Sequence, residues 1–183
     1  MMADIANINI LIPAWVDGDL TPVEKLAVHQ RGLRHLAVSV FVMRAGKILI
    51  QRRALGKYHT PGLWANTCCT HPNWEEPPLT CANRRLDEEL GITGLTLEHR
   101  GQVTYHADVG GGLIENEVVE VFSATAPDDL VITPNSDEVM DIAWIDPATL
   151  REELKTNPQA YTPWLRIYMA EHAQMILGDL ADR

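Results

Sequence analysis

Two glutamates in the segment LIENEVVEVF, residues 113–122, could hold a metal ion. If this segment forms a β-strand, alternate residues share a face, so Glu115 and Glu117 lie on one stripe with valine side chains. Burying two like charges this close together is costly unless a cation compensates them. The pattern therefore predicts a metal site, and the alternative is a solvated edge strand that carries scattered valines.

Three histidines precede this segment and could complete such a site. His29 and His35 stand before the first long apolar run, and His71 stands in NTCCTHP. Imidazole nitrogens combined with carboxylate oxygens suit a divalent transition ion such as Mn²⁺ or Zn²⁺. The five candidate ligands are His29, His35, His71, Glu115 and Glu117. The remaining histidines, His59, His99, His106 and His172, are interpreted as ordinary surface or core residues.

A cysteine near His71 could transfer protons. Cys69 lies two residues before His71, so an extended or turn backbone directs both side chains toward one site. A nearby cation or metal lowers the pKa of a thiol from about 8.5, which would suit Cys69 to this role. Cys68 and Cys81 are interpreted as inert buried thiols. A structural zinc site of Cys68, Cys69 and His71 is the alternative, although no paired C-x₂-C motif accompanies it.

Basic side chains flank the cysteine segment in a chain whose net charge is −10. That charge argues against nonspecific binding to nucleic acid or an anionic membrane, so an anionic substrate requires locally concentrated cations. Arginine binds phosphate oxygens in a bidentate manner, and lysine contributes a point charge. The candidates are Lys25, Arg52, Arg53, Lys57, Arg84 and Arg85, and the Arg52–Arg53 pair at a strand end is favoured among them.

These residues must be positioned by one folded unit. A length of 183 residues with 46% hydrophobic content fits a single domain. The odd number of cysteines predicts a reducing, cytoplasmic location. The first 18 residues carry acidic side chains and a short apolar stretch interrupted by Pro13, which indicates neither a signal peptide nor a membrane span.

Apolar periodicity predicts the elements of that domain. Residues 36–43 and 47–52 indicate a β-hairpin, and residues 101–106, 113–126 and 139–145 indicate further strands. A helix is expected over residues 78–90, with Gly91 ending it and with Arg85 and Glu89 on its polar face. One terminal helix is expected over residues 163–177. This order predicts an α+β fold in which helices pack on a mostly antiparallel or mixed sheet.

The predicted helix carries a motif. The segment ending in RRLDEELGI resembles the Nudix box G-x₅-E-x₇-R-E-U-x-E-E-x-G-U. Two positions depart from the box, because Thr70 replaces its glycine and Arg85 replaces its first helical glutamate. In Nudix pyrophosphohydrolases that glutamate helps to hold the hydrolytic magnesium, so Arg85 favours phosphate binding without cleavage. The matching residues are Glu76, Arg84, Leu86, Glu88, Glu89, Gly91 and Ile92.

The chain contains four further motifs besides this box, and they point to a more specific family. The motifs are QRRALGKYHTPGLWANTCCTHP, ENE, DEVMDIAW and YTPWL. Together these motifs, from about residue 23 to residue 165, resemble the type 1 isopentenyl-diphosphate isomerases. The resemblance implies a Nudix-like fold, a mixed β-sheet sandwiched by helices in a single domain. It also implies an N-terminal extension over 1–32, a catalytic domain over 33–167, and a C-terminal helix end and tail over 168–183.

The implied activity is the reversible 1,3-allylic rearrangement of isopentenyl diphosphate to dimethylallyl diphosphate in isoprenoid biosynthesis. The implied acid–base pair is Cys69 and Glu117, with Tyr105 beside the glutamate. The expected protein is a cytoplasmic monomer or weak dimer that binds this small isoprenoid diphosphate and neither nucleic acid nor a membrane.

The resemblance also implies binding roles. His29, His35, His71, Glu115 and Glu117 correspond to a site for Mn²⁺ or Zn²⁺. Glu89, with the Cys69 carbonyl, corresponds to a site for Mg²⁺ that arrives with the diphosphate. Lys25, Arg53, Lys57 and Arg85 match the cations on the diphosphate side, and Trp164 matches an aromatic over the hydrocarbon.

Two other functions stay open at the level of sequence. A Nudix hydrolase would cleave a nucleoside diphosphate derivative and hold magnesium with Glu76, Glu88 and Glu89. A non-enzymatic Nudix-like module would bind a ligand or a partner protein and would need no complete set of metal ligands.

Overall fold

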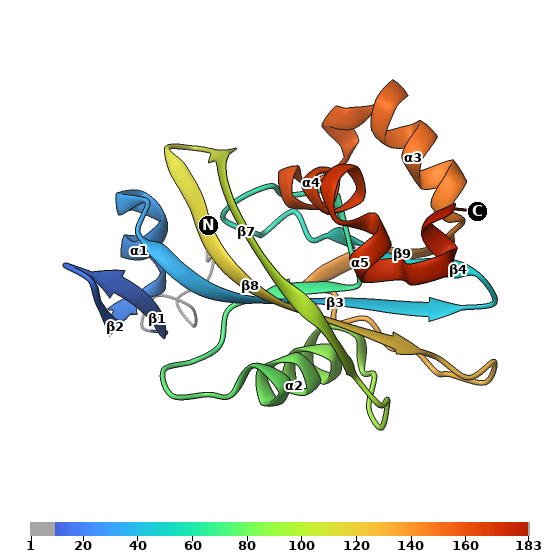
Figure 1. Cartoon of the computed structure of the whole chain (residues 1–183), viewed down its shortest axis with the longest axis horizontal. Helices are drawn as coiled ribbons and strands as arrows, with labels where there is room; N and C mark the ends of the chain where they lie inside the picture. Colours follow the sequence, from blue (N-terminus) through green and yellow to red (C-terminus); the bar gives the residue numbers. More distant parts are fainter. Residues whose placement is uncertain (1–9, 183) are drawn as a thin grey trace.

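A curved sheet with helices on both sides organises the chain in the computed structural model (Figure 1). The structure describes residues 10–182, so the first nine residues of the expected N-terminal extension and the last residue of the tail lie outside it. The strands are β1 (Leu11–Val16), β2 (Asp19–Glu24), β3 (Arg34–Arg44), β4 (Lys47–Arg53), β5 (Trp64–Ala65), β6 (Cys68–Thr70), β7 (Glu98–Gly110), β8 (Leu113–Thr125) and β9 (Val139–Ile145). The helices are α1 (Lys25–Arg31), α2 (Pro78–Leu90), α3 (Pro147–Thr156), α4 (Pro163–Glu171) and α5 (Ala173–Leu177), with 3₁₀ turns at η2 (Pro158–Ala160) and η3 (Gly178–Asp182).

Strand β3 is the centre of the sheet. It pairs in parallel with β8 and antiparallel with β1, β4 and β6. Its pairing with β4 is confined to the residues beside their turn, and β4 then pairs with β5 and β9 instead. Strand β8 also forms a long antiparallel ladder with β7. The sheet is therefore mixed, as predicted.

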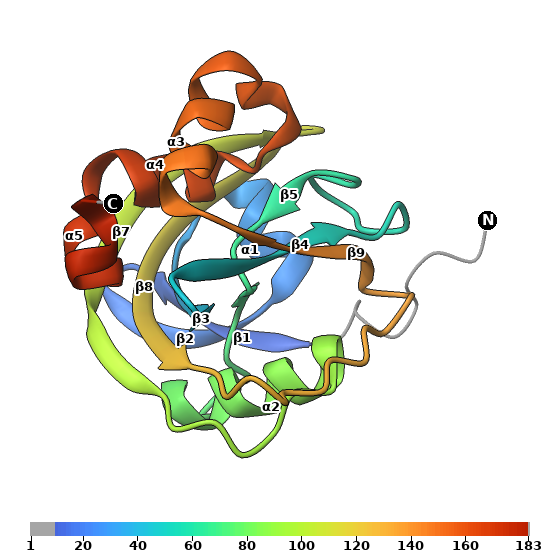
Figure 2. The same ribbon diagram turned by 90° about the vertical axis from the view of Figure 1, so that its right-hand side faces the viewer.

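Two apolar cores lie on opposite faces of the sheet because successive strand residues point in opposite directions. Val38 and Val40 of β3 pack in one core with Leu86 of α2. Ala37 and Phe41 of the same strand belong to the other core. The helices α4 and α5 cover that second core, and the view in Figure 2 shows them beside β7 and β8. The expectation of a sheet sandwiched by helices is confirmed.

Helix α2 spans the predicted residues 78–90. A proline occupies its first turn, and Gly91 ends it in the left-handed conformation at φ 63°. The Gly91 N–H donates to the Asp87 carbonyl, which satisfies a group that the helix end would otherwise leave unpaired. Glu89, expected on the polar face, is only 5% exposed because it lies against other polar side chains.

Other elements differ from the sequence-based expectations. The hairpin β1–β2 and the helices α1 and α3 were not predicted. The expected single helix over residues 163–177 is wrong, because His172 adopts φ −129° and ψ 8° and divides it into α4 and α5. The break allows α4 to pack on β7 while α5 reaches both β7 and β8. None of the described helices is long and apolar enough to span a membrane.

Candidate active site

The strand register brings the candidate catalytic residues to one face of the sheet. His35 of β3 lies opposite Glu117 of β8, and Ser39 of β3 lies opposite Cys69 of β6. Directly paired residues share a face, and so do residues four positions apart along one strand. Cys69 and Glu117 therefore lie on two different strands that pair with β3, and their side chains are on the same face of the sheet. In sequence, 48 positions separate them.

Four buried side chains form a compact cluster at this position. His29, His35, His71 and Glu117 each offer one ligand atom, and these atoms lie within 4.8 Å of one another. The Nε2 atom of His71 lies 2.8 Å from Glu117 Oε1 and 3.2 Å from His35 Nε2. The His35 Nε2 atom is 3.4 Å from the same carboxylate oxygen. Two imidazole nitrogens that face each other and one carboxylate are an arrangement that a shared cation would satisfy.

The hydrogen bonds of the histidines fit a metal site. His29 Nδ1 donates to the Lys25 carbonyl at 2.7 Å, and His35 Nδ1 donates to the Leu33 carbonyl at 2.8 Å. These bonds leave the lone pair on Nε2 of each ring, which is the usual orientation of metal-binding histidines. Within residues 10–182, His29 Nε2 is buried and has no hydrogen-bond partner. The residues present therefore fit a divalent ion.

Burial sets the charge of the rings. It lowers the pKa of His29 to about 4, and the neighbouring His35 acts in the same direction. Burial also lowers the pKa of His71 well below its usual value, although the Glu117 carboxylate opposes this change. Both rings are neutral at pH 7, which is the form that coordinates a metal.

The pKa values of the two β8 glutamates are shifted in opposite directions. Burial and the nearby Glu117 raise the pKa of Glu115 well above its usual value. Burial also acts to raise the pKa of Glu117, but the His35 and His71 rings beside its carboxylate outweigh burial and hold that pKa well below its usual value. The Tyr105 hydroxyl lies 2.5 Å from Glu117 Oε2 and 2.9 Å from Glu115 Oε2, so it joins the two carboxyl groups.

Glu115 lies slightly apart from the four-residue cluster. Its nearest potential ligand group contains His29 and His59, so His29 is common to both groups. His59 Nε2 lies 3.5 Å from Glu115 Oε1, and its side chain is buried in the site. The interpretation of His59 as an ordinary residue outside the site is wrong. Its position two residues after Lys57 was the one available sequence signal.

Cys69 lies beside this cluster, and Ser39 contacts its sulfur. The Ser39 hydroxyl donates to Cys69 Sγ at 3.2 Å and lies 2.8 Å from the Tyr168 hydroxyl. Burial raises the pKa of the Cys69 thiol well above its usual value, and the charges of Glu117 and Glu115 raise it further. The Arg53 guanidinium acts in the expected, lowering direction but does not outweigh these effects. The thiol is protonated at pH 7 and can donate a proton.

Cys68 points to the other face of the sheet. It is fully buried in the core beneath α2, because adjacent residues of β6 alternate in direction. A zinc site that uses both Cys68 and Cys69 is incompatible with this arrangement, and the described residues contain no such metal group.

A pocket opens above Cys69 and Glu117, and all four cations expected on the diphosphate side line it. The chain brings Lys25 from α1, Arg53 from the end of β4, Lys57 from the loop after β4, and Arg85 from α2. Trp164 of α4 forms another part of the wall and lies with its ring 5.4 Å from the Arg53 guanidinium carbon. The other lining residues are Tyr58, His59, Thr70, His71, Glu89 and Glu115.

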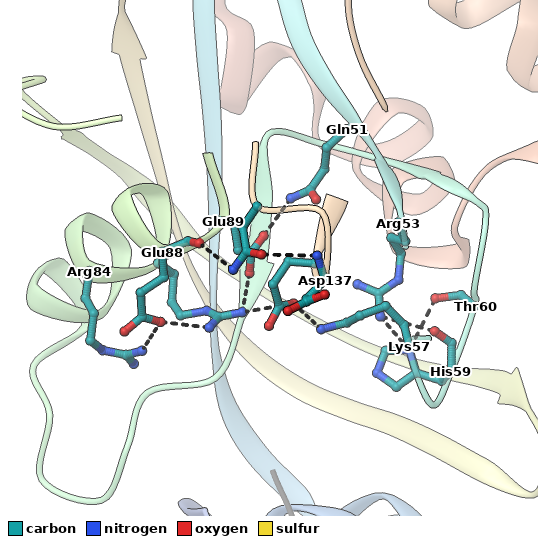
Figure 3. A network of polar contacts seen from close by, with 12 residues as sticks. Gln51, Arg53, Lys57, His59, Thr60, Arg84, Glu88, Glu89 and Asp137 are labelled. Atoms are coloured by element: carbon teal, nitrogen blue, oxygen red, sulfur yellow. Dashed lines mark hydrogen bonds and ion pairs between the residues drawn. The ribbon is translucent and has the colours of Figure 1, made fainter. Parts of the chain in front are cut away.

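Two of the basic candidates are engaged elsewhere. The Arg52 Nε atom donates to the Gly62 carbonyl at 2.9 Å, so the favoured Arg52–Arg53 pair is divided and only Arg53 lines the pocket. Arg84 forms a bidentate pair with Glu76 at 2.6 and 2.7 Å. It also donates to Glu88 at 3.0 Å, a contact visible in Figure 3.

Arg85 and Gln51 form hydrogen bonds with the other carboxylates of the Nudix box. Arg85 donates to Glu88 at 2.8 Å and to Glu89 at 2.6 Å. The second oxygen of Glu89 accepts from Gln51 at 2.7 Å (Figure 3). Each of the three acidic residues of the box thus has an arginine partner within the protein.

The pocket wall also contains unsatisfied hydrogen-bond donors. Within the described part of the chain, Arg53 Nε, Arg85 Nε and Trp164 Nε1 are buried without an acceptor. Buried donors normally have an acceptor. Three buried donors without one around a single pocket therefore indicate that a ligand supplies the acceptors. An oxygen-rich anion would do so.

Comparison with known proteins agrees with these features. The family model described as the NUDIX domain matches residues 33–165. A protein of Dinoroseobacter shibae named isopentenyl-diphosphate Delta-isomerase is 63% identical over 171 residues, which cover 93% of this chain and 97% of that protein. A Ruegeria pomeroyi protein of the same name is 61% identical over 170 residues, with 93% and 94% of the two chains covered.

Solved structures show the same fold at low identity. A crystal structure from Deinococcus radiodurans matches with a TM-score of 0.69 at 15% identity and covers 86% of this chain and 94% of its own. A MutT NUDIX hydrolase from Burkholderia pseudomallei matches with a TM-score of 0.57 at 24% identity, with 73% and 94% covered. The fold is shared with these proteins, whereas the two isomerases match over nearly the whole chain at 63% and 61% identity. The chain therefore belongs to the Nudix domain family and, within it, to the family of the isopentenyl-diphosphate Delta-isomerases.

Proposed function

We propose that this protein interconverts isopentenyl diphosphate and dimethylallyl diphosphate by protonation and deprotonation, as a step of isoprenoid biosynthesis. The observation that carries the proposal is that Cys69 and Glu117 line one buried pocket whose wall also holds four cations. The names and the near-complete coverage of the relatives support the same reaction.

The chemistry explains why such a pocket is needed. An isolated alkene is a very weak base, and its protonation gives a tertiary carbocation that water would trap, so the site must exclude solvent. One proton is added to the terminal alkene carbon, and another leaves the allylic carbon. Two groups across the substrate are required, and we assign them to Cys69 and Glu117, with Tyr105 holding the glutamate. Each group acts in both directions because the reaction is reversible.

The carbocation and the diphosphate end of the substrate require different side chains in the pocket wall. Trp164, which is 1% exposed, is assigned to face the hydrocarbon, where its π face stabilises a positive charge by about 2 kcal/mol. Lys25, Arg53, Lys57 and Arg85 are assigned to the diphosphate, whose oxygens would satisfy the orphan donors of the two arginines.

Two ions complete the proposed site. His29, His35, His71, Glu115 and Glu117 would hold Mn²⁺ or Zn²⁺, and Glu89 with the Cys69 carbonyl would hold Mg²⁺ that arrives with the diphosphate. The bound ion would compensate negative charge on the β8 carboxylates, because the neutral His29 and His71 rings carry no positive charge.

The arginines count against nucleotide hydrolysis. A hydrolase would need Glu76, Glu88 and Glu89 together for magnesium, whereas Arg84 already pairs with Glu76, and Arg84 and Arg85 both pair with Glu88. A binding module without catalysis would need neither the clustered metal ligands nor a buried thiol beside them.

The proposal extends to organisation and location. We assign residues 1–32 to an extension whose described part contributes His29 and Lys25 to the catalytic domain over 33–167, and residues 168–183 to the C-terminal helix end and tail. The protein works in the cytoplasm as a monomer or weak dimer, on a small isoprenoid diphosphate and without nucleic acid or membrane as a partner. The three free cysteines support a reducing location.

The test is incubation of the purified protein with isopentenyl diphosphate, Mg²⁺ and Mn²⁺ in D₂O, followed by NMR. Formation of dimethylallyl diphosphate that carries deuterium is the expected result, and Cys69→Ser should nearly abolish it. An unchanged spectrum from folded, metal-loaded protein would overturn the proposal. So would release of phosphate from nucleoside diphosphate derivatives at a rate that Cys69→Ser does not affect.

A further inference from the structure

A carboxylate outside the pocket contacts two of its cations. Glu138 Oε2 forms a close ion pair with Lys57 Nζ and lies 3.5 Å from an Arg85 nitrogen. The side chains of Glu138 and Lys57 are 17% and 11% exposed, so water screens their pairing less than at an open surface. Glu138 is not one of the residues that line the pocket, whereas Lys57 and Arg85 are. It therefore contacts the two cations without lying in the path of a ligand.

The backbone of Glu138 is hydrogen-bonded toward two of the elements that carry other cations, β4 with Arg53 and α2 with Arg85. Its carbonyl accepts from Ala54 N–H at 2.9 Å, directly after Arg53 at the end of β4. Its N–H donates to the Asn135 carbonyl at 2.9 Å, and Asn135 N–H in turn donates to the Glu89 carbonyl of α2 at 2.9 Å. Glu138 is thus a fixed point between β4 and α2.

Lys57 depends on this fixed point more than Arg85 does. Arg85 has two closer carboxylate partners, Glu88 and Glu89. Lys57 lies in the irregular loop that follows β4, and within residues 10–182 its ammonium group has Glu138 as its only ion-pair partner. A lysine side chain has several rotatable bonds, so an isolated ammonium group on a loop would sample many positions.

We propose that Glu138 is a positioning residue that holds the Lys57 ammonium group at the pocket wall, where it binds the diphosphate end of the substrate. This inference rests on the proposed function only for the identity of the anion. Glu138 acts through Lys57 and touches neither the substrate nor the reacting atoms.

The sign of the change in anion affinity when Glu138 is replaced distinguishes a positioning role from a purely electrostatic one. Glu138 is a negative charge beside four cations, so its neutralisation alone would strengthen the attraction for an anion. If Glu138 positions Lys57, its loss weakens anion binding instead, because the lysine must then be ordered at the expense of binding free energy.

The experiment measures binding of inorganic diphosphate with Mg²⁺ by calorimetry on the full-length, metal-loaded protein, together with kcat and KM for isopentenyl diphosphate. Glu138→Gln should raise the Kd and the KM about fivefold and leave kcat within about twofold. Glu138→Asp keeps the charge but withdraws the carboxylate by one methylene group, and it should also weaken binding. Asp137→Asn is the matched control, since Asp137 is exposed and forms no ion pair among the described residues. Its Kd should stay within about twofold of wild type.

Tighter diphosphate binding by Glu138→Gln, together with unchanged binding by Glu138→Asp, would overturn the positioning role and leave only a charge effect. The Lys57→Met background gives a second check, because there Glu138→Gln should change the Kd by less than about twofold. A full fivefold loss in that background would show that Glu138 does not act through Lys57. If Glu138→Gln proved too unstable to assay, Glu138→Asp would decide the question. These binding data stand even if wild type fails to isomerise isopentenyl diphosphate, so the two proposals fail separately.

Discussion

The protein contains two groups of carboxylates that differ in their partners. On β8, Glu115 and Glu117 face histidines in a buried site. On α2 and the turn before it, Glu76 and Glu88 face the guanidinium groups of arginines. The residue type is the same in both regions, but only the second group has its charge balanced by the protein.

The partner therefore determines what each group can bind. A neutral imidazole offers a lone pair and no charge, so the β8 group attracts a cation that both ligand types can share. An arginine offers five donors and a permanent charge, so the α2 group has no need of an ion. With arginine at position 85, Glu76 and Glu88 are paired within the protein, and the histidine–glutamate group around β8 is the group that fits a divalent ion.

Neutralising one carboxylate in each region should give the largest contrast. Glu117→Gln should reduce turnover about 10³-fold, because it removes both a proton-transfer group and a metal ligand. Glu76→Gln should leave turnover within about threefold of wild type, because Glu76 contacts Arg84 and does not line the pocket. Conversion of isopentenyl diphosphate and the content of bound metal would both be measured.

Equal losses of turnover in the two variants would contradict the difference in role between the β8 glutamates and the arginine-paired glutamates. A fully active Glu117→Gln variant would remove the assigned acid–base role.

The elements of this comparison were predictable from local patterns. The helix over residues 78–90 followed from apolar spacing and from Gly91, and the two faces of residues 113–122 followed from strand alternation. Local chain geometry determines both, so no knowledge of distant contacts was needed.

The residues that sequence analysis missed depend on contacts between distant segments. His59 enters the site because the loop after β4 folds over Glu115, and Ser39 reaches Cys69 only through the register of β3 and β6. The raised pKa of Cys69 likewise results from burial and from two glutamates nearly 50 positions away. The break at His172 has no sequence signal of its own, and it separates α4, which packs on β7, from α5, which contacts both β7 and β8.

Restoring a glutamate on the helix is the next test of the comparison. Arg85→Glu recreates the Nudix pattern but removes a cation that lines the pocket. The KM for isopentenyl diphosphate should rise about tenfold without efficient hydrolysis of nucleoside diphosphate derivatives. Steady-state kinetics and phosphate release would be followed in parallel. A variant with an unchanged KM would show that Arg85 does not bind the diphosphate.

The cations of the pocket should also make anion binding depend on pH. Burial and the neighbouring charges of Lys57, Arg85 and Arg53 lower the pKa of Lys25 to about 8, although Glu138 acts in the opposite direction. Lys25 is therefore charged below pH 8 and loses its charge as the pH rises above it. The affinity for inorganic diphosphate should fall severalfold between pH 7 and pH 9, and Lys25→Met should remove most of this dependence. An equally steep decline in Lys25→Met would assign the titration to another group.

The smallest effect concerns the stability contributed by the arginine-paired group. Arg84 and Glu76 have side chains that are 29% and 11% exposed, so water screens their bidentate pair in part. Glu76→Gln should lower the free energy of unfolding by about 1 kcal/mol, or the Tm by about 2–4 °C.

The hydrogen bonds from Arg84 are the main reason why the pKa of Glu76 lies below its usual value. A lowered carboxyl pKa gives stability that is present above the unfolded-state pKa and is lost as the pH falls through the folded-state pKa. The difference in Tm between wild type and Glu76→Gln should therefore shrink as the pH falls from 7 to 3 in thermal unfolding scans. A difference that stays constant over this range would mean that the pair stabilises the helix by packing rather than by charge.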